Sequence, residues 1–332
     1  MSEPLLESLI WDNHACMPLR PGDVTFLDRL TAVHAAGVDV VSLNVSTAKQ
    51  RYQFAVSVLE TYRTWIEERS DRFLIVSSAA DAMLAHATNR LGVCFDVEGA
   101  DVLESDPENV ARLYDLGVRW MLLVYNTRNE FGCGCMVEDD GLTPLGRRVV
   151  AEMNRVGMVV CTSHGGYRTA REIIDASSAP VIFSHSNPKA VWDHPRNISD
   201  ELMRACAKRG GVIGINGFGP FLGRNEPGTR RFVDHLLYTL DLVGPDHVGI
   251  ALDYVFDVAE LDAFITANPA AFPPQYFQSG AHMVGHDQMK DIVQAVRARG
   301  YGPHELANIF GCNHLRIAQT LWRRPGGVTA DD

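Results

Sequence analysis

The stretch SDELMRACAKRGGVIGI, residues 199–215, holds the pattern that decides the fold. Its first part, Ser199–Arg209, has the pattern of an amphipathic helix and is followed by Gly210, a residue type that commonly ends helices. The second part, Gly211–Ile215, is a short apolar run, which is typical of a strand buried on both faces. A helix, a glycine and a buried strand in this order indicate one βα unit of a parallel sheet.

The same order recurs along the chain, because most of the other helix candidates also end at a glycine that precedes an apolar run. The helix candidates are Phe26–Ala36, Ser57–Arg69, Asn109–Leu116, Thr143–Val156, Ser199–Arg209 and Thr229–Val243. The apolar runs are Leu9–Trp11, Val38–Val45, Leu91–Val97, Val118–Tyr125, Gly157–Cys161, Pro180–Phe183, Gly211–Ile215 and Val248–Leu252. Phe73–Val76 is expected to form an extra short strand.

Eight strands that alternate with helices form either a closed barrel or a doubly wound open sheet. No G-x-G-x-x-G loop follows the first strand, which disfavours a dinucleotide-binding sheet. The sequence therefore predicts a (β/α)₈ TIM barrel as one domain over residues 1–323, with a flexible tail over 324–332. Long loops are expected at 126–142 and 217–229, and a long irregular stretch at 259–287, on the side where barrel enzymes build their sites.

Composition excludes several classes of function and location. The formal net charge of -11 argues against nucleic-acid binding, which needs a basic face. The seven cysteines are odd in number and several lie in apolar runs, so a reducing compartment is expected rather than a disulfide framework. The N-terminus lacks a signal-peptide pattern, and no apolar run approaches the roughly 20 residues of a membrane span. We therefore expect a cytoplasmic protein that binds no membrane.

Polar residues with metal-binding side chains stand where the apolar runs stop. In a barrel the carboxyl ends of all strands meet at one mouth, so these residues are expected to share one pocket. Zn²⁺ accepts nitrogen, oxygen and sulfur ligands, and in His14-Ala15-Cys16 the first and third side chains point to the same face of a strand. The candidates are His14, Cys16, Glu98, His164, His185 and Asp253.

This set is suited to hydrolysis. A bound metal lowers the pKa of water to roughly 7 and polarises the carbonyl under attack, and Asp253 could take and pass on the proton. Other interpretations remain open for three residues: Glu98 could pair with an arginine, Cys16 could fill the core, and Arg196 could close a turn. Arg196 also lies on the loop after the His185 run, where its guanidinium could grip a substrate carboxylate through two hydrogen bonds.

With these motifs in order, the chain resembles the membrane (renal) dipeptidase family, peptidase family M19, within the amidohydrolase superfamily of barrels. The resemblance runs over nearly the whole chain. The matching segments are WDNH (11–14), GLTPLG (141–146), GM (157–158), SH (163–164), SHSN (184–187), HPRN (194–197), GGVIG (210–214), HVGIALD (247–253) and GCNHLR (311–316).

The resemblance implies a centre with two zinc ions and a homodimer. His14 would bind the first ion, Glu98 would bridge both ions, and His164 and His185 would bind the second. The resemblance further assigns Arg196 to the substrate's C-terminal carboxylate and Asp253 to proton transfer. A dipeptide or similar small molecule is the implied substrate.

The chain departs from the family at two positions. The family's first-strand aspartate is Cys16 here, so either a thiolate binds the first ion or that site is lost and one ion remains. The family's fourth-strand histidine, which steadies the developing oxyanion, is absent from MLLVYN (121–126), where Tyr125 or Asn126 could donate instead.

Three hypotheses follow. The first is a metal-dependent hydrolase of a dipeptide or small carboxylate-bearing amide. The second is a hydrolase of the same fold that cleaves a lactone, a cyclic amide or another non-peptide bond. The third is a catalytically silent barrel that binds a ligand.

Overall fold

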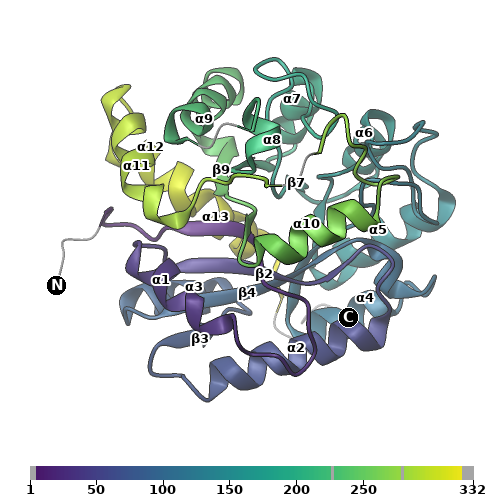
Figure 1. Ribbon diagram of the computed structural model, residues 1–332, viewed down its shortest axis with the longest axis horizontal. Coiled ribbons are helices and arrows are strands. Elements are labelled where there is room, and N and C mark those ends of the chain that lie inside the picture. The colour runs from purple at the N-terminus through teal and green to yellow at the C-terminus, as the bar shows by residue number, and fades with distance from the viewer. Residues whose placement is uncertain (1–4, 226–227, 278–279, 324–332) are drawn as a thin grey trace.

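The computed structural model, which describes residues 5–225, 228–277 and 280–323, is a closed barrel of eight parallel strands wrapped by helices (Figure 1). The strands pair in the order β1-β2-β4-β5-β6-β7-β8-β9, and β1 also pairs with β9, which closes the ring. The predicted (β/α)₈ barrel is thereby confirmed. The predicted tail, residues 324–332, lies outside the described residues, and the prediction of a single domain over residues 1–323 stays a prediction.

Each of the eight apolar runs contains or begins a barrel strand. β1 starts at the last residue of the first run and continues through the His14–Cys16 motif. The predicted extra strand is β3 (Phe73–Ile75), which pairs with the first residues of β4, and β10 (Tyr254–Val255) pairs with the end of β1. The barrel strands are β1 (Trp11–Cys16), β2 (Val40–Thr47), β4 (Leu91–Glu98), β5 (Val118–Leu122), β6 (Val159–Cys161), β7 (Ile182–Phe183), β8 (Val212–Asn216) and β9 (Val248–Ala251).

All six predicted helices are found, but the structure has further helices that those ranges do not cover. Among these, a short helix lies at 219–222 within a predicted loop, and α10 overlaps 259–287, where an irregular stretch was predicted. The prediction was wrong there because α10 is apolar on more than one side, so it lacks the one-sided helical pattern. The helices are α1 (Leu30–Ala35), α2 (Tyr52–Glu67), α3 (Ala79–Ala87), α4 (Asn109–Leu116), α5 (Pro144–Val156), α6 (Tyr167–Ala176), α7 (Asp200–Lys208), α8 (Gly219–Leu222), α9 (Thr229–Val243), α10 (Val258–Ala267), α11 (Met289–Ala298), α12 (Pro303–Ala307) and α13 (Asn313–Leu321).

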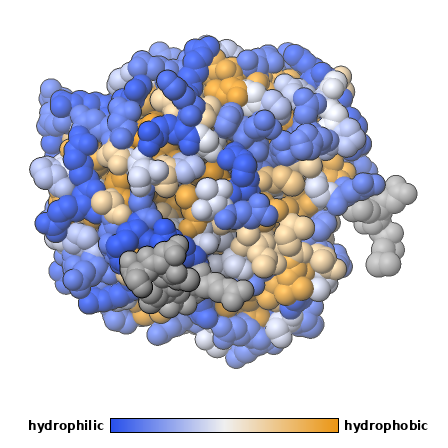
Figure 2. All heavy atoms as spheres, turned by 180° about the vertical axis from the view of Figure 1, so that it is seen from behind, coloured by the Kyte–Doolittle hydropathy of each residue, from blue (hydrophilic) through white to orange (hydrophobic). Residues whose placement is uncertain are grey.

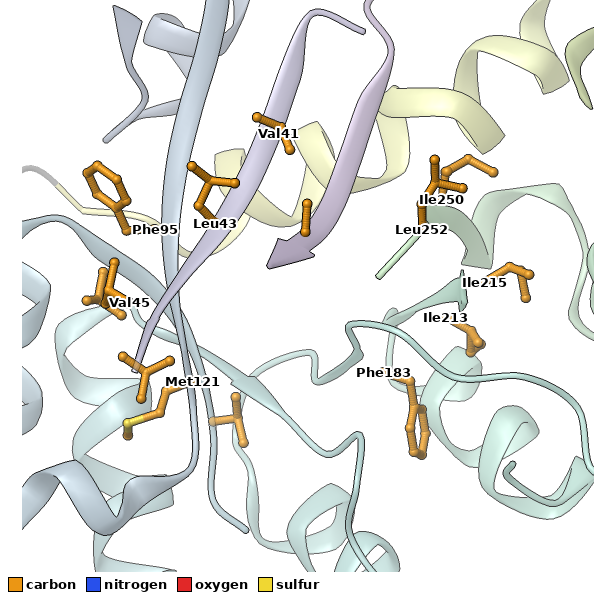
Figure 3. Packing of buried hydrophobic residues seen from close by; sticks show 14 of the residues in the cluster. Val41, Leu43, Val45, Phe95, Met121, Phe183, Ile213, Ile215, Ile250 and Leu252 are labelled. Carbon is orange, nitrogen blue, oxygen red and sulfur yellow. The ribbon is translucent and has the colours of Figure 1, made fainter. Parts of the chain in front are cut away.

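The strands place alternate side chains outside and inside the barrel. On β4, Phe95 and Val97 belong to the large apolar cluster that includes residues of the surrounding helices. Strand residues of this cluster from β2, β4, β5, β7, β8 and β9 are shown in Figure 3. Asp96 and Glu98, on the other face of β4, contact side chains of β1 inside the barrel. The alternation therefore brings two carboxylates of one strand into the interior.

The amino end of the barrel is closed by α13. The ring of Trp11 on β1 lies 5.8 Å from that of Trp322, which directly follows α13, and Leu315 and Ala318 of α13 pack in the same apolar cluster as Trp11. The carboxyl end, in contrast, holds the loops and α10, which crosses the front of the molecule in Figure 1. Polar side chains at the strand ends consequently face these loops.

The molecular surface is mixed. Seen from behind, it is mostly hydrophilic, with apolar residues at several places, including an area to the lower right (Figure 2). Among the described residues, no helix has both the length and the apolar character that a membrane crossing requires.

The loop at 126–142 approaches the end of β5 so closely that it requires a glycine. A Cβ at Gly134 would lie 2.0 Å from the carbonyl oxygen of Tyr125, and this neighbour is backbone that cannot rotate away. We predict that Gly134→Ala lowers the free energy of unfolding by about 1–3 kcal/mol, as overpacking does elsewhere. A urea unfolding midpoint measures the loss.

The matched control for this prediction is Gly302→Ala. A Cβ at Gly302 would meet only the end of the Glu305 side chain, at 3.7 Å. The same midpoint in both variants would contradict the prediction.

Candidate metal centre

The predicted ligands come together at the carboxyl end of the barrel, around the carboxylate of Glu98. Its Oε1 lies 3.4 Å from the Nε2 atoms of three imidazoles, those of His14, His164 and His185. The Nε2 atoms of His164 and His185 lie 2.9 Å apart. All four side chains are buried, with at most 5% of any one exposed. Strands β1, β4, β6 and β7 or the residues just after them supply the four groups, as the strand-end argument predicted.

A second group of donor atoms adjoins the first. The Nε2 atom of His14 lies 3.4 Å from Cys16 Sγ and 3.5 Å from Asp253 Oδ1, and the latter two atoms are 3.7 Å apart. The other carboxylate oxygen of Asp253 accepts a hydrogen bond from Asn216 Nδ2 at 2.8 Å. Cys16 and Asp253 therefore face the same imidazole nitrogen as Glu98.

The Nδ1 atom of each imidazole, on the side of the ring away from Glu98, contacts a polar side chain. Asp96 Oδ2 lies 3.4 Å from Nδ1 of His14 and also accepts a 2.7 Å hydrogen bond from Ser42 Oγ. The Nδ1 atom of His185 lies 2.8 Å from Ser184 Oγ, and that of His164 lies 2.7 Å from Asn126 Oδ1. Such partners fix the ring orientation of metal-binding histidines, so all three Nε2 atoms point into the centre.

Sequence reasoning missed Asp96, Ser184 and Asn216, although each carried a signal. Asp96 precedes Glu98 by two residues, so both share the inner face of β4. Ser184 directly precedes His185. Asn216 is the last residue of β8 and is thus a polar residue where an apolar run stops, the same criterion that selected the other candidates. Asn126 was predicted as a hydrogen-bond donor to the substrate. In the structure its Oδ1 atom contacts Nδ1 of His164, and its Nδ2 atom donates to the carbonyl oxygen of Ala271.

The centre is rich in acidic groups that have been removed from water. Burial raises the pKa of Asp253, and burial raises that of Asp96 to about 6 despite the neighbouring His14. Burial alone would raise the pKa of Glu98, but the nearby His14 charge and hydrogen bonds from the histidines lower it well below its usual value. Burial also raises the pKa of the Cys16 thiol. A cation at this place would offset the mutual repulsion of these groups.

The imidazoles of His164 and His185 are poor proton acceptors. Burial, and to a smaller extent the positive charge of Arg196, lowers the pKa of His164 to about 3. Burial and the nearby His14 charge lower the pKa of His185 well below its usual value. Both rings are therefore neutral near pH 7. A neutral imidazole is the form that binds metals.

The donor set fits a divalent metal ion of zinc's coordination habits. Zinc bonds of about 2.0–2.3 Å in tetrahedral geometry separate neighbouring ligand atoms by roughly 3.3–3.6 Å. The distances among His14, Cys16 and Asp253, and those from Glu98 to the three imidazoles, lie between 3.4 and 3.7 Å, close to this range. The Nε2 atoms of His164 and His185, 2.9 Å apart, would have to separate slightly to bind the same ion. His14, Cys16 and Asp253 form one group whose ligand atoms lie within 4.8 Å of one another, and His14, Glu98 and His185 form another.

A cavity of about 190 Å³ opens onto the centre. Cys16, Glu98, His164 and Asp253 line its floor together with Tyr125, whose ring stacks on His164 at 4.2 Å. Its outer wall is apolar and comes largely from α8, α10 and the segment after α10. These wall residues include Phe218, Phe221, Leu261, Phe264, Ile265, Phe272 and Phe277.

Arg196 lies beside this cavity but does not line it. Its guanidinium carbon sits 5.1 Å from the ring centre of Phe221, and Phe221 faces the cavity. Its Nη2 atom donates to the carbonyl oxygen of His185 at 3.2 Å, and among the described residues its buried Nε atom has no partner. Arg196 thus contacts a residue of the cavity wall rather than the cavity itself.

Two of the candidates adopt a backbone conformation that non-glycine residues rarely take. The φ angles are 66° at His164 and 55° at Asp253, both in the left-handed region. Such residues cost about 1–3 kcal/mol and persist where the surrounding structure fixes them, typically at functional sites. Here the Asp253 amide donates to the His14 carbonyl oxygen, and the Cys135 amide donates to that of His164.

The contact behind His14 gives a testable prediction. Replacing Asp96 by Asn removes the acceptor charge at Nδ1 of His14 while keeping the side-chain volume. We expect metal affinity to fall by roughly 10–100-fold, the usual cost of losing such a partner. Competition with a chromophoric chelator measures the affinity. Asp71→Asn, at an exposed position, serves as the control, and equal affinities in the two variants would count against the prediction.

The chain is similar in sequence to known dipeptidases. A sequence model of the membrane dipeptidase family (peptidase family M19) matches residues 27–263. A dipeptidase of Clonostachys rogersoniana is 29% identical over 266 residues, which are 79% of this chain and 64% of that protein. An uncharacterized dipeptidase of Schizosaccharomyces pombe is 30% identical over 238 residues, 70% of this chain and 54% of that protein. The chain thus spans about half to two thirds of the length of these curated relatives.

Solved structures agree with the fold. An amidohydrolase of Pseudomonas aeruginosa superposes with a TM-score of 0.85 at 26% identity, over 95% of this chain and 97% of that one. A metallopeptidase of Rhodobacter sphaeroides, solved with a phosphinate mimic of the dipeptide L-Ala-D-Ala, superposes with a TM-score of 0.77 at 21% identity, over 95% and 100%. Because the second structure is only 21% identical in sequence, its similarity establishes the fold alone.

Proposed function

Because the chain belongs to the membrane dipeptidase family, peptidase family M19, we propose that it is a metal-dependent hydrolase of dipeptides or small carboxylate-bearing amides. Membership confirms the resemblance drawn from the sequence motifs. The observation that carries the proposal is the position of Glu98 Oε1, 3.4 Å from three imidazole nitrogens that are all held with Nε2 inward. The dipeptide mimic bound by the R. sphaeroides relative supports the substrate class.

We propose zinc as the ion, with two ions per chain. Glu98, His164 and His185 would hold one, and His14, Cys16 and Asp253 would hold the other, with Glu98 between them. When bound, such ions polarise a carbonyl group and lower the pKa of water, so that hydroxide forms near neutral pH. Metal content per chain, measured in wild type and Cys16→Ala, separates two ions from one.

Asp253 is proposed to carry the proton. Its Oδ2 is held by Asn216, so the carboxylate is fixed at the edge of the cavity. It would accept a proton as a water oxygen bonds to the scissile carbon. It would then deliver that proton to the amine nitrogen as the carbon–nitrogen bond breaks.

Tyr125 is proposed to take the place of the family's fourth-strand histidine as the donor to the developing oxyanion. It lines the cavity, and its ring is fixed against His164. Burial and the nearby Glu98 and Asp253 raise the pKa of Tyr125 well above its usual value, so its hydroxyl keeps its proton and can donate. Asn126 supports His164 instead. Arg196 remains the proposed partner of the substrate carboxylate.

The second candidate function is hydrolysis of a lactone or cyclic amide. Two departures from the family favour it, namely Cys16 in place of an aspartate and Tyr125 in place of a histidine. A substrate panel decides between the two functions: metal-loaded protein should release free amino acids from dipeptides and leave lactones intact. Lactone turnover without dipeptide turnover would replace the first proposal by the second.

Failure to bind Zn²⁺ or Mn²⁺ after chelation would favour the third hypothesis, a catalytically silent barrel.

The cellular setting and assembly are also proposals. We propose a cytoplasmic homodimer, supported by the seven free cysteines and by the apolar area on the reverse face (Figure 2). Light scattering on purified protein would give the mass in solution, and a monomer at all concentrations would contradict the dimer. Cell fractionation with a tagged copy would test the compartment.

A further inference from the structure

Cys16 contributes sulfur to a centre that otherwise consists of nitrogen and oxygen. Its Sγ atom, the Nε2 atom of His14 and Oδ1 of Asp253 form a triangle with sides of 3.4, 3.5 and 3.7 Å. A tetrahedral ion with nitrogen and oxygen bonds near 2.0 Å and a sulfur bond near 2.3 Å would separate these atoms by about 3.3–3.6 Å. Two sides of the triangle lie within this range and the third, Cys16 Sγ to Asp253 Oδ1, exceeds it slightly, so the three atoms are close to one face of such a coordination shell.

The imidazole of this triangle is fixed independently of Cys16. Asp96 and Ser42 hold its Nδ1 side, and its ring stacks on that of His185 at 4.2 Å. The Nε2 atom can therefore face only the side where Cys16, Asp253 and Glu98 converge. This arrangement is what a metal ligand needs, whereas a cysteine that merely fills the core needs no imidazole nitrogen at contact distance.

The other half of the centre offers a different chemistry. Glu98, His164 and His185 supply one oxygen and two nitrogens at mutual distances of 2.9 and 3.4 Å. Carboxylates and imidazoles accept Mn²⁺, Co²⁺ and Zn²⁺, whereas thiolates select soft ions. The two halves consequently differ in the ions that they favour.

We propose that the centre is asymmetric: the half formed by His14, Cys16 and Asp253 is a thiolate site that selects a thiophilic ion, Zn²⁺ or Cd²⁺, over Mn²⁺ or Mg²⁺. The half formed by Glu98, His164 and His185 accepts ions of either kind. This inference rests on one part of the proposed function, namely that the centre binds a divalent ion. On binding, the Cys16 thiol releases its proton to solvent and its sulfur bonds the ion, with no change of oxidation state.

The first test uses Co²⁺ as a spectroscopic probe on chelator-stripped protein. Wild type should show the near-ultraviolet charge-transfer band that a thiolate–Co²⁺ bond produces, and Cys16→Ser should lack it. Two controls should keep the band: Cys135→Ser, which alters a cysteine beside Asn126, and Cys312→Ser, which alters a half-buried cysteine at the closed end of the barrel. Absence of the band in wild type, or its survival in Cys16→Ser, overturns the proposal.

The second test measures selectivity and does not depend on the serine variant folding. In Cys16→Asp the site has the family's own carboxylate, so the preference for Cd²⁺ over Mn²⁺, expressed as a ratio of dissociation constants, should fall by at least about tenfold. Calorimetric titration of the stripped protein gives both constants. An unchanged ratio overturns the proposal.

Failure of this inference can be told apart from failure of the proposed function. Dipeptide hydrolysis by a protein that shows no thiolate–cobalt band would overturn the asymmetric site and leave the function standing. A thiolate–cobalt band in a protein that hydrolyses no dipeptide would support the site and overturn the function.

Discussion

Replacing Glu98 by Gln is expected to lower kcat/KM for dipeptides by at least about a thousandfold, because the variant loses the negative charge that both metal positions share. In the wild-type protein Oε1 stands 3.4 Å from each of the Nε2 atoms of His14, His164 and His185. Glutamine keeps the size of the side chain and the contact to Asn44, but a neutral amide cannot bridge two cations. Metal content per chain should fall in parallel, and hydrolysis assays with elemental analysis measure both effects.

The control for this prediction is Glu60→Gln, on the exposed face of α2. It makes the same chemical change far from the cavity and should alter neither metal content nor rate. If Glu98→Gln kept its metal and its turnover, the bridging role of Glu98 would be wrong, and the centre would have to be built on the histidines alone.

The sequence was sufficient to predict the fold, and to predict which side chains lie together at the mouth of the barrel, because both follow from local patterns. Each apolar run is buried on both faces and is followed by a polar residue, and in a parallel barrel all strand ends meet at one mouth. His164 and His185 therefore needed no knowledge of one another to be placed together. The helices that end at Gly117 and Gly244 likewise end where local chemistry dictates, with φ angles of 116° and 83° at these glycines.

The contacts that Asp96 and Asn126 make could not be predicted in this way, although Asp96 could have been placed on the inner face of its strand, because each contact depends on the three-dimensional arrangement of the strands. Asp96 reaches His14 only because β1 and β4 lie on either side of β2 with a particular stagger across the interior. Asn126 reaches His164 only because the backbone of His164 turns into the left-handed region at the strand end. Neither contact can be predicted from the composition or the residue spacing of a single segment.

The proposed asymmetry of the centre depends on a single residue, Cys16, at the end of β1. A thiolate in place of a carboxylate keeps the charge of the ligand but changes its softness and lengthens its bond. The barrel has room for the change because Cys16 lies at the last position of β1, where the cavity begins.

Replacing Asp253 by Asn is expected to lower kcat for dipeptides by roughly 10²–10⁴-fold, because an amide cannot take a proton from water or return it to the leaving amine. The geometry makes this variant informative. Asn216 Nδ2 donates to Oδ2 of Asp253 at 2.8 Å, while Asn216 Oδ1 accepts the Phe218 amide at 2.6 Å, so Asn216 cannot turn to accept from a new amide group. The variant's own oxygen should therefore keep the Asn216 contact.

The rate loss in Asp253→Asn should be accompanied by a KM within a fewfold range of wild type, since Arg196 and the apolar wall are unchanged. The thiolate–cobalt band should survive at saturating Co²⁺ because His14 and Cys16 remain in place, whereas the affinity of that half for the ion should fall because Asp253 is one of its proposed ligands. Asp234→Asn, on the exposed side of α9, is the matched control and should behave as wild type. A variant that kept its metal and more than half of the wild-type kcat would show that another group moves the proton.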